Sequence, residues 1–121
     1  MHWIAIAVFA VVVILFYIIT RSGQIDESAA RAHLKDGALI IDVRTPHEFS
    51  SGHLPRAINL PLDQIESSLP RRVKDKSQIL LLHCHSGMRS GAAKKKLNAM
   101  GYANAFNLGS YGRASRIVNG D

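Results

Sequence analysis

The apolar and polar positions divide the chain into one long apolar segment and a region where short apolar runs alternate with polar ones. Residues 3–19 are apolar without interruption and contain no charged residue, proline or glycine. A helix over these residues reaches roughly 25 Å, which is just enough for a thin bilayer. We therefore expect residues 1–20 to form a single-pass transmembrane helix and residues 21–121 to form one domain.

Two other interpretations of the apolar segment are weaker. A cleaved secretory signal normally begins with basic residues, but only Met1 and His2 precede the segment, and the Ala30-Arg31-Ala32 triplet lies too far downstream to serve as its cleavage site. A buried core helix would need a polar face toward water, which continuous apolar sequence does not supply. We expect a retained anchor, with the cleaved signal as the main alternative.

The charges lie outside the apolar segment. Arg21, Arg31 and Lys35 follow it, and the positive-inside rule then places the domain in the cytoplasm, although the small charge bias leaves a periplasmic or extracytoplasmic side open. The net charge of +6 favours an anionic membrane surface or small anionic substrates. The basic run 94–96 has no interleaved aromatic residue and is typical of a solvated helix face, so we expect no nucleic acid partner.

Short periodic runs predict an alternation of strands and helices in the domain. Helices begin where residues such as Asp26 can cap them, and end near Gly37 and Gly101. The expected helices cover 26–36, 63–69 and 89–100, and the expected strands cover 38–43, 56–61, 78–83 and 104–108. The Pro-containing stretch 45–55 is expected to be a loop. This alternation predicts an α/β fold with a small parallel sheet flanked by helices.

Polar residues follow two of the apolar strands. Asp42, Val43 and Arg44 close the first strand, and Cys84 comes directly after the third. Ligands bind beyond the carboxyl ends of parallel strands, so neighbouring strands would bring Arg44 and Cys84 to a common crevice.

Cys84 is the only cysteine, which excludes an intramolecular disulfide and leaves an inert core residue or a reactive thiol. The short loop after it, His85-Ser86-Gly87-Met88, leads to Arg89 and a helix. Successive backbone N–H groups of such a loop form an anion-binding nest, and the following helix adds its positive end. A thiol in this field is expected to ionise readily and to act as a nucleophile.

The length of this loop separates two kinds of cysteine chemistry. Four residues lie between Cys84 and Arg89, whereas the similar loop of cysteine phosphatases has five. The tighter ring suits a sulfur atom bound to Cys84 better than a phosphoryl group.

Several motifs in order resemble those of the single-domain rhodaneses, a family of sulfurtransferases. CHSGMRS at 84–90 resembles their active-site loop, and LIIDVRTPHEF at 39–49 resembles their Asp-Val-Arg segment. GHLPRAINLPL at 52–62 and LNAMGYANAFNLGS at 97–110 match the corresponding later segments, so the resemblance covers about 24–110. Arg56 stands where the family usually has a small residue. The family often ends with Gly-Gly and a downstream tryptophan, whereas this chain has Gly109-Ser110-Tyr111, which puts the last helix in doubt.

The resemblance implies a rhodanese fold and a two-step reaction without a metal or an organic cofactor. Cys84 would take the outer sulfur of a small anionic donor such as thiosulfate and pass it to cyanide or a thiol, which is covalent ping-pong catalysis. Residues 85 to 89, namely His85, Ser86, Gly87, Met88 and Arg89, would bind the substrate, helped by Arg44.

Some roles stay open at this stage. Arg89 could attract the donor or brace the loop, Arg44 could instead pair with a carboxylate such as Glu48, and Asp42 is expected to orient the loop. His83, Cys84 and His85 cannot easily converge on a metal, because neighbours on an extended chain point to alternate sides. A non-catalytic binding module at a membrane, or a small phosphatase or arsenate reductase, is the alternative function.

Overall fold

The computed structural model describes the backbone of residues 1–120 and the side chains of residues 1–18 and 23–120. Its centre is a parallel sheet of four strands in the order β2-β1-β3-β4, and the expected α/β fold is confirmed. The strands are β1 (Leu39–Asp42), β2 (Ile58–Asn59), β3 (Leu80–His83) and β4 (Ala105–Gly109), each within the range that the hydrophobic pattern predicts or one residue beyond it.

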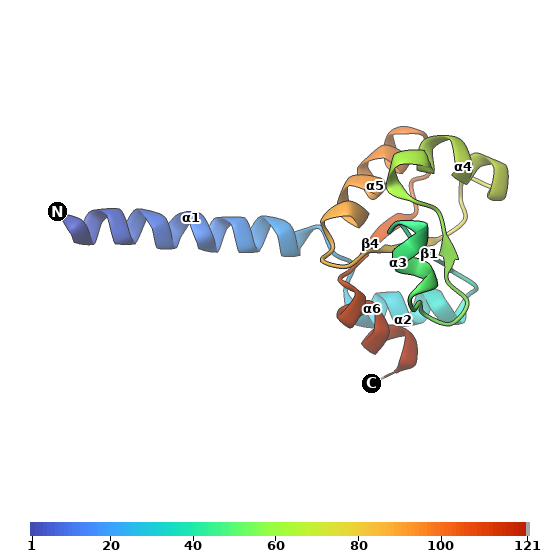
Figure 1. Ribbon diagram of the computed structural model, residues 1–121, viewed down its shortest axis with the longest axis horizontal. Coiled ribbons are helices and arrows are strands. Elements are labelled where there is room, and N and C mark those ends of the chain that lie inside the picture. The colour runs from blue at the N-terminus through green and yellow to red at the C-terminus, as the bar shows by residue number, and fades with distance from the viewer. Residues whose placement is uncertain (121) are drawn as a thin grey trace.

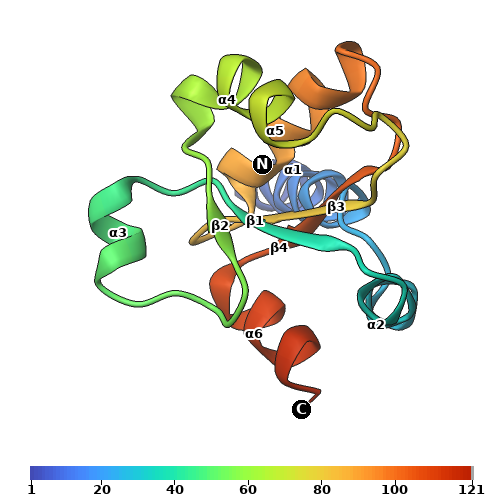
Figure 2. The ribbon, with the colours of Figure 1, turned by 90° about the vertical axis from the view of Figure 1, so that its right-hand side faces the viewer.

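Helices cover both faces of this sheet, as Figure 2 shows. One face carries α4 (Ile65–Arg72) and α5 (Met88–Ala99), and the other carries α2 (Glu27–Lys35) and α6 (Tyr111–Asn119). Because successive strand residues point to opposite faces, Leu80 and Leu82 enter one buried cluster, whereas Leu81 enters the other. Cys84 continues the Leu80–Leu82 series and therefore lies on the α5 side.

One expected loop contains a helix. The short α3 (Pro46–Ser50) lies within residues 45–55, and its N-terminus is closed by a capping box. The Thr45 hydroxyl accepts from the Glu48 backbone N–H at 3.2 Å, and the Glu48 carboxylate accepts from the Thr45 N–H at 3.1 Å. The Thr-x-x-Glu spacing with proline at the first helical position was the available signal for a helix here.

The ends of one expected helix differ from expectation, and a last helix that had been in doubt is present. The 3-10 turn η1 (Leu62–Gln64) leads into α4, which continues past Pro70 to Arg72 instead of stopping there. Only two residues of α4 follow this proline, so its missing N–H interrupts the helix near its exposed end, where the cost is small. A last helix, α6, follows Ser110, whose hydroxyl accepts from the Arg113 N–H at 3.1 Å as an N-terminal cap.

The apolar N-terminal segment forms α1 (His2–Ser22), which points away from the sheet (Figure 1). Its apolar side chains from Trp3 to Ile18 are exposed. Among the residues whose side chains are described, no helix combines the length and the apolarity needed to cross a membrane. The predicted transmembrane anchor is therefore not supported. Ile19 and Arg21, which entered the prediction of its end and its orientation, lie outside these residues.

Candidate active site

The two strands that carry candidate residues are neighbours. β1 and β3 pair in parallel, with Asp42 opposite His83, and the Val43 N–H donates to the His83 carbonyl at 3.0 Å. Arg44 and Cys84 therefore leave the same edge of the sheet from adjacent strands, as the alternation of strands and helices predicted.

The loop after Cys84 is held from several directions by the end of β4 and the start of α6. The Cys84 N–H donates to the Gly109 carbonyl at 3.3 Å, and the Tyr111 N–H donates to the His85 carbonyl at 3.1 Å. Ser86 and Ser110 form an isolated bridge between the two segments. The geometry of the cysteine loop thus depends on residues some twenty-five positions later in the chain.

Gly87 gives the loop its sharp turn into α5. Its φ of +96° lies in the left-handed region that side chains rarely adopt. A Cβ at this position would lie 3.3 Å from Nε2 of Gln24 and 3.4 Å from the Gly109 backbone, so there is also little room for one. The turn aims the Gly87 N–H at the Cys84 Sγ, which it reaches at 3.0 Å.

The thiol of Cys84 is buried, and its surroundings favour ionisation. Burial is the largest single influence on its pKa and raises it. Hydrogen bonds from Ser90, through both its hydroxyl and its backbone, and from the backbone of Gly87 and Ser86 together outweigh burial, so the pKa of this thiol lies below its ordinary value. Cys84 is 0% exposed.

Ser90 connects the thiol to a buried asparagine on β4. Its hydroxyl lies 3.5 Å from the Cys84 Sγ and 2.7 Å from the Asn107 Oδ1. The Asn107 amide also donates to the Gly87 carbonyl at 3.1 Å, and its oxygen accepts from the Gly109 N–H at 2.9 Å. Because a hydroxyl has one proton, Ser90 donates either to Asn107 or to the thiolate, while Asn107 holds the loop in both states.

Arg89, in the first turn of α5, forms an ion pair with Glu48 of α3. Its two terminal nitrogens donate to the two carboxylate oxygens at 2.7 and 3.0 Å. This pair lowers the pKa of Glu48 to about 2 and raises that of Arg89. The arginine therefore braces the start of α5 against α3, and it adds positive charge near the thiol.

Arg44 has a different partner from the one considered above. Its guanidinium binds both carboxylate oxygens of Asp42 at 2.7 to 3.0 Å, donates to the Gly52 carbonyl at 2.8 Å and stacks on Tyr111. Asp42 also accepts from the Arg44 backbone N–H at 3.0 Å, which fits its expected role in orienting the loop. The suggested Arg44–Glu48 pair is wrong, because Glu48 is taken by Arg89.

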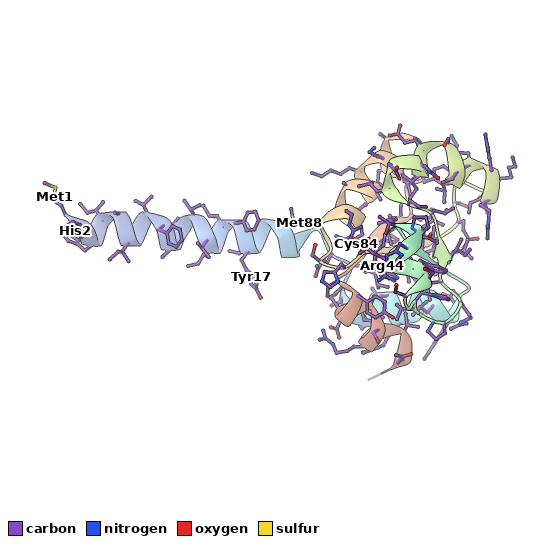
Figure 3. The ribbon with its side chains drawn as sticks, viewed as in Figure 1. Met1, His2, Tyr17, Arg44, Cys84 and Met88 are labelled. Carbon is purple, nitrogen blue, oxygen red and sulfur yellow. The ribbon has the colours of Figure 1, made fainter. Side chains whose placement is uncertain are left out.

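The remaining loop residues differ in exposure. His85 and Ser86 are exposed, and the Met88 side chain is 66% exposed. Figure 3 shows Met88 where α1 meets the domain, with Cys84 and then Arg44 lying further from α1 in this view. The sequence did not single out Ser90 or Asn107, although both lie inside the quoted motifs.

Known proteins share this fold and part of this sequence. The family model for the rhodanese-like domain matches residues 26–112. The chain belongs to the rhodanese-like domain family. Thiosulfate sulfurtransferase PspE of Escherichia coli K12 is 38% identical over 69 residues, which are 57% of this chain and 66% of PspE. A sulfurtransferase of Allochromatium vinosum is 33% identical, over 70% of this chain and 79% of its own length.

A solved structure, of a rhodanese with anions from E. coli, superposes with a TM-score of 0.61. It is 34% identical, covering 64% of this chain and 91% of the solved one. These relatives support a rhodanese-like sulfurtransferase as the enzyme class, and the cysteine loop described above lies within the matched part of the rhodanese-like domain.

Proposed function

We propose that this rhodanese-like domain moves sulfane sulfur through a persulfide on Cys84. The Cys84 thiolate attacks the outer sulfur of thiosulfate or a similar donor, a new S–S bond forms, and sulfite leaves with the electron pair of the old one. An acceptor thiolate or cyanide then attacks the terminal sulfur and returns the Cys84 thiolate.

The observation that carries the proposal is the ring of hydrogen-bond donors around one sulfur atom. The Gly87 N–H lies 3.0 Å from the Sγ, and donors from Ser90 and Ser86 contribute to the lowered pKa of the thiol. Such donors stabilise the thiolate that attacks, and they also stabilise the thiolate that leaves when the acceptor takes the sulfur.

Burial of the thiol favours a small donor. Cys84 is 0% exposed, and the loop beside it carries the exposed side chains of His85 and Met88, so the proposal favours a compact donor over a bulky one. Arg89 adds positive charge near the thiol, and its pair with Glu48 braces the loop. In the proposal Arg44 acts through Asp42 on the adjacent strand end and not by touching the donor.

A mass measurement tests this mechanism directly. The full chain is incubated with thiosulfate, desalted and weighed, and a gain of one sulfur atom is expected. Since the chain has only one cysteine, Cys84→Ser should abolish the gain. Cyanide should then remove the sulfur as thiocyanate. Absence of any gain with thiosulfate and other sulfane donors would defeat the proposal, and turnover of an aryl phosphate or arsenate would support the phosphatase or reductase alternative.

Membrane attachment through residues 3–19, with the domain on the cytoplasmic side, stays a prediction from the sequence alone. Fractionation of cells that express the full chain, followed by protease treatment of sealed vesicles, checks both parts. Recovery of the chain in the soluble fraction contradicts attachment.

A further inference from the structure

A pocket lies beside the cysteine loop. Its volume is about 640 Å³, and it is lined by the cysteine loop, the first turns of α5, the start of α6, the segment around Gln24, Asn107 of β4 and Tyr17 of α1. Cys84 does not line it. The Gly87 backbone forms the wall between the two, because its N–H reaches the sulfur while its Cα faces Gln24.

The charged side chains described as lining this pocket are all cationic. Lys94 and Lys95 line it from α5, and Arg113 and Arg116 line it from α6, whereas no acidic residue lies among its described lining residues. Four cationic side chains that converge on one concave surface concentrate anions there, and the concave shape strengthens their field.

The four cations differ in how they are engaged. Arg113 donates to the carbonyls of Leu108 and Ile25, which holds its guanidinium in place. Arg116 lies 3.5 Å from Glu27 in an exposed pair. In the part of the chain that the structure describes, neither Lys94 nor Lys95 forms an ion pair, so their charges are available to a ligand.

We infer that this pocket binds an organic anion with two or more charged groups, at a site that adjoins the cysteine loop but does not include Cys84. The volume exceeds what thiosulfate needs, and Ala92, Met88 and the lysine stems give the ligand carbon atoms to contact. The same chemistry occurs in a soluble polycarboxylate or phosphate and in the headgroup of an anionic lipid. Because the Gly87 backbone is a shared wall, an occupant also contacts the loop that holds Cys84.

The test is a titration of the full chain carrying Cys84→Ser, so that its result does not depend on sulfur transfer. The probes are citrate, inorganic phosphate and vesicles of phosphatidylcholine with or without phosphatidylglycerol, followed by calorimetry and by the amide NMR signals of Ser86 and Gly87. Saturable binding that shifts these two signals is expected with at least one anionic probe, and the probe that binds identifies the source of the anion.

A matched pair of variants decides whether the pocket is responsible. Lys94→Gln with Lys95→Gln should weaken binding at least about tenfold, because each lost charged hydrogen bond contributes on this order. Lys35→Gln with Lys74→Gln removes the same net charge from exposed residues that do not line the pocket, and should change binding less than about twofold. Equal weakening by both pairs, or no saturable binding of any probe, overturns the inference.

Discussion

Arg89 meets Glu48 end-on: Nη1 donates to Oε1 at 2.7 Å, and Nη2 donates to Oε2 at 3.0 Å. The two residues lie forty-one positions apart, at the beginnings of α5 and α3. The pair therefore joins the cysteine loop to α3, which lies in a stretch that was predicted to be a loop. Both side chains are about one-third exposed, so solvent screens the interaction.

This pair predicts an acid-dependent loss of stability. The pKa of Glu48 falls from 4.5 to about 2 on folding, so the pair contributes fully above pH 4.5 and its contribution is lost as the pH falls toward 2. Glu48→Gln should reduce the free energy of unfolding by about 0.5–1 kcal/mol at pH 7 and by less near pH 2.5. Urea unfolding at a series of pH values measures this. Asp63→Asn removes another exposed carboxylate and serves as the control. If its stability also differed from that of the unsubstituted protein at pH 7 and approached it near pH 2.5, the assignment of the effect to Glu48 would be contradicted.

Ser90→Ala should raise the pKa of the Cys84 thiol, because the hydroxyl is a donor to the thiolate. The thiolate fraction at neutral pH then falls, and alkylation by iodoacetamide at pH 7 should slow about three- to tenfold. Ser86→Ala is the matched control, since Ser86 acts on the thiol through its backbone, and it should alkylate at the normal rate. The pH dependence of alkylation in each variant gives the pKa; an unchanged profile in Ser90→Ala would show that the backbone donors suffice.

Asn107→Ala should destabilise the domain by about 1–3 kcal/mol, because it leaves the Gly87 carbonyl and the Gly109 N–H without their buried partner. Sulfur loading of Cys84 should fall as well, since the loop loses its support. Urea unfolding at pH 7 and the mass measurement are the two readouts. Asn104→Ala is a useful comparison, because its amide donates to the Ser77 carbonyl at 2.9 Å in an exposed turn away from the loop, and its effect should stay below about 1 kcal/mol. Equal effects of the two substitutions would argue against a special role for Asn107.

Arg56 is the one non-glycine residue with a positive φ, +65°, among the described residues. Arg56→Gly should relieve this strain and stabilise the domain by about 0.5–1 kcal/mol, after the larger backbone entropy of glycine in the unfolded chain is subtracted. Arg56→Ala keeps the Cβ and should gain little. Thermal or urea unfolding of both variants checks the difference, and a loss of stability in Arg56→Gly would mean that the arginine side chain makes a compensating contribution.

The predicted transmembrane anchor shows the limit of what a hydrophobic pattern can predict. Residues 3–18 are apolar and helical as expected, but the apolarity of a segment does not state what covers it. In the structure these side chains are exposed. Among the residues whose side chains are described, no helix is long and apolar enough to span a membrane. What covers the apolar side chains of α1 therefore depends on its surroundings and cannot be predicted from its own sequence.

The sequence by itself determined the α/β alternation, the parallel sheet and the position of Cys84 at a strand end, because these follow from local periodicity and from the rule that ligands bind where parallel strands end. It also determined the length of the cysteine loop, because the number of residues between Cys84 and Arg89 is a local property. Only the tertiary structure decided the partners: Asp42 for Arg44, Glu48 for Arg89, and Asn107 for Ser90. The sequence could not decide which carboxylate pairs with which arginine. That pairing depends on strand pairing and helix placement, which bring together residues far apart in the chain.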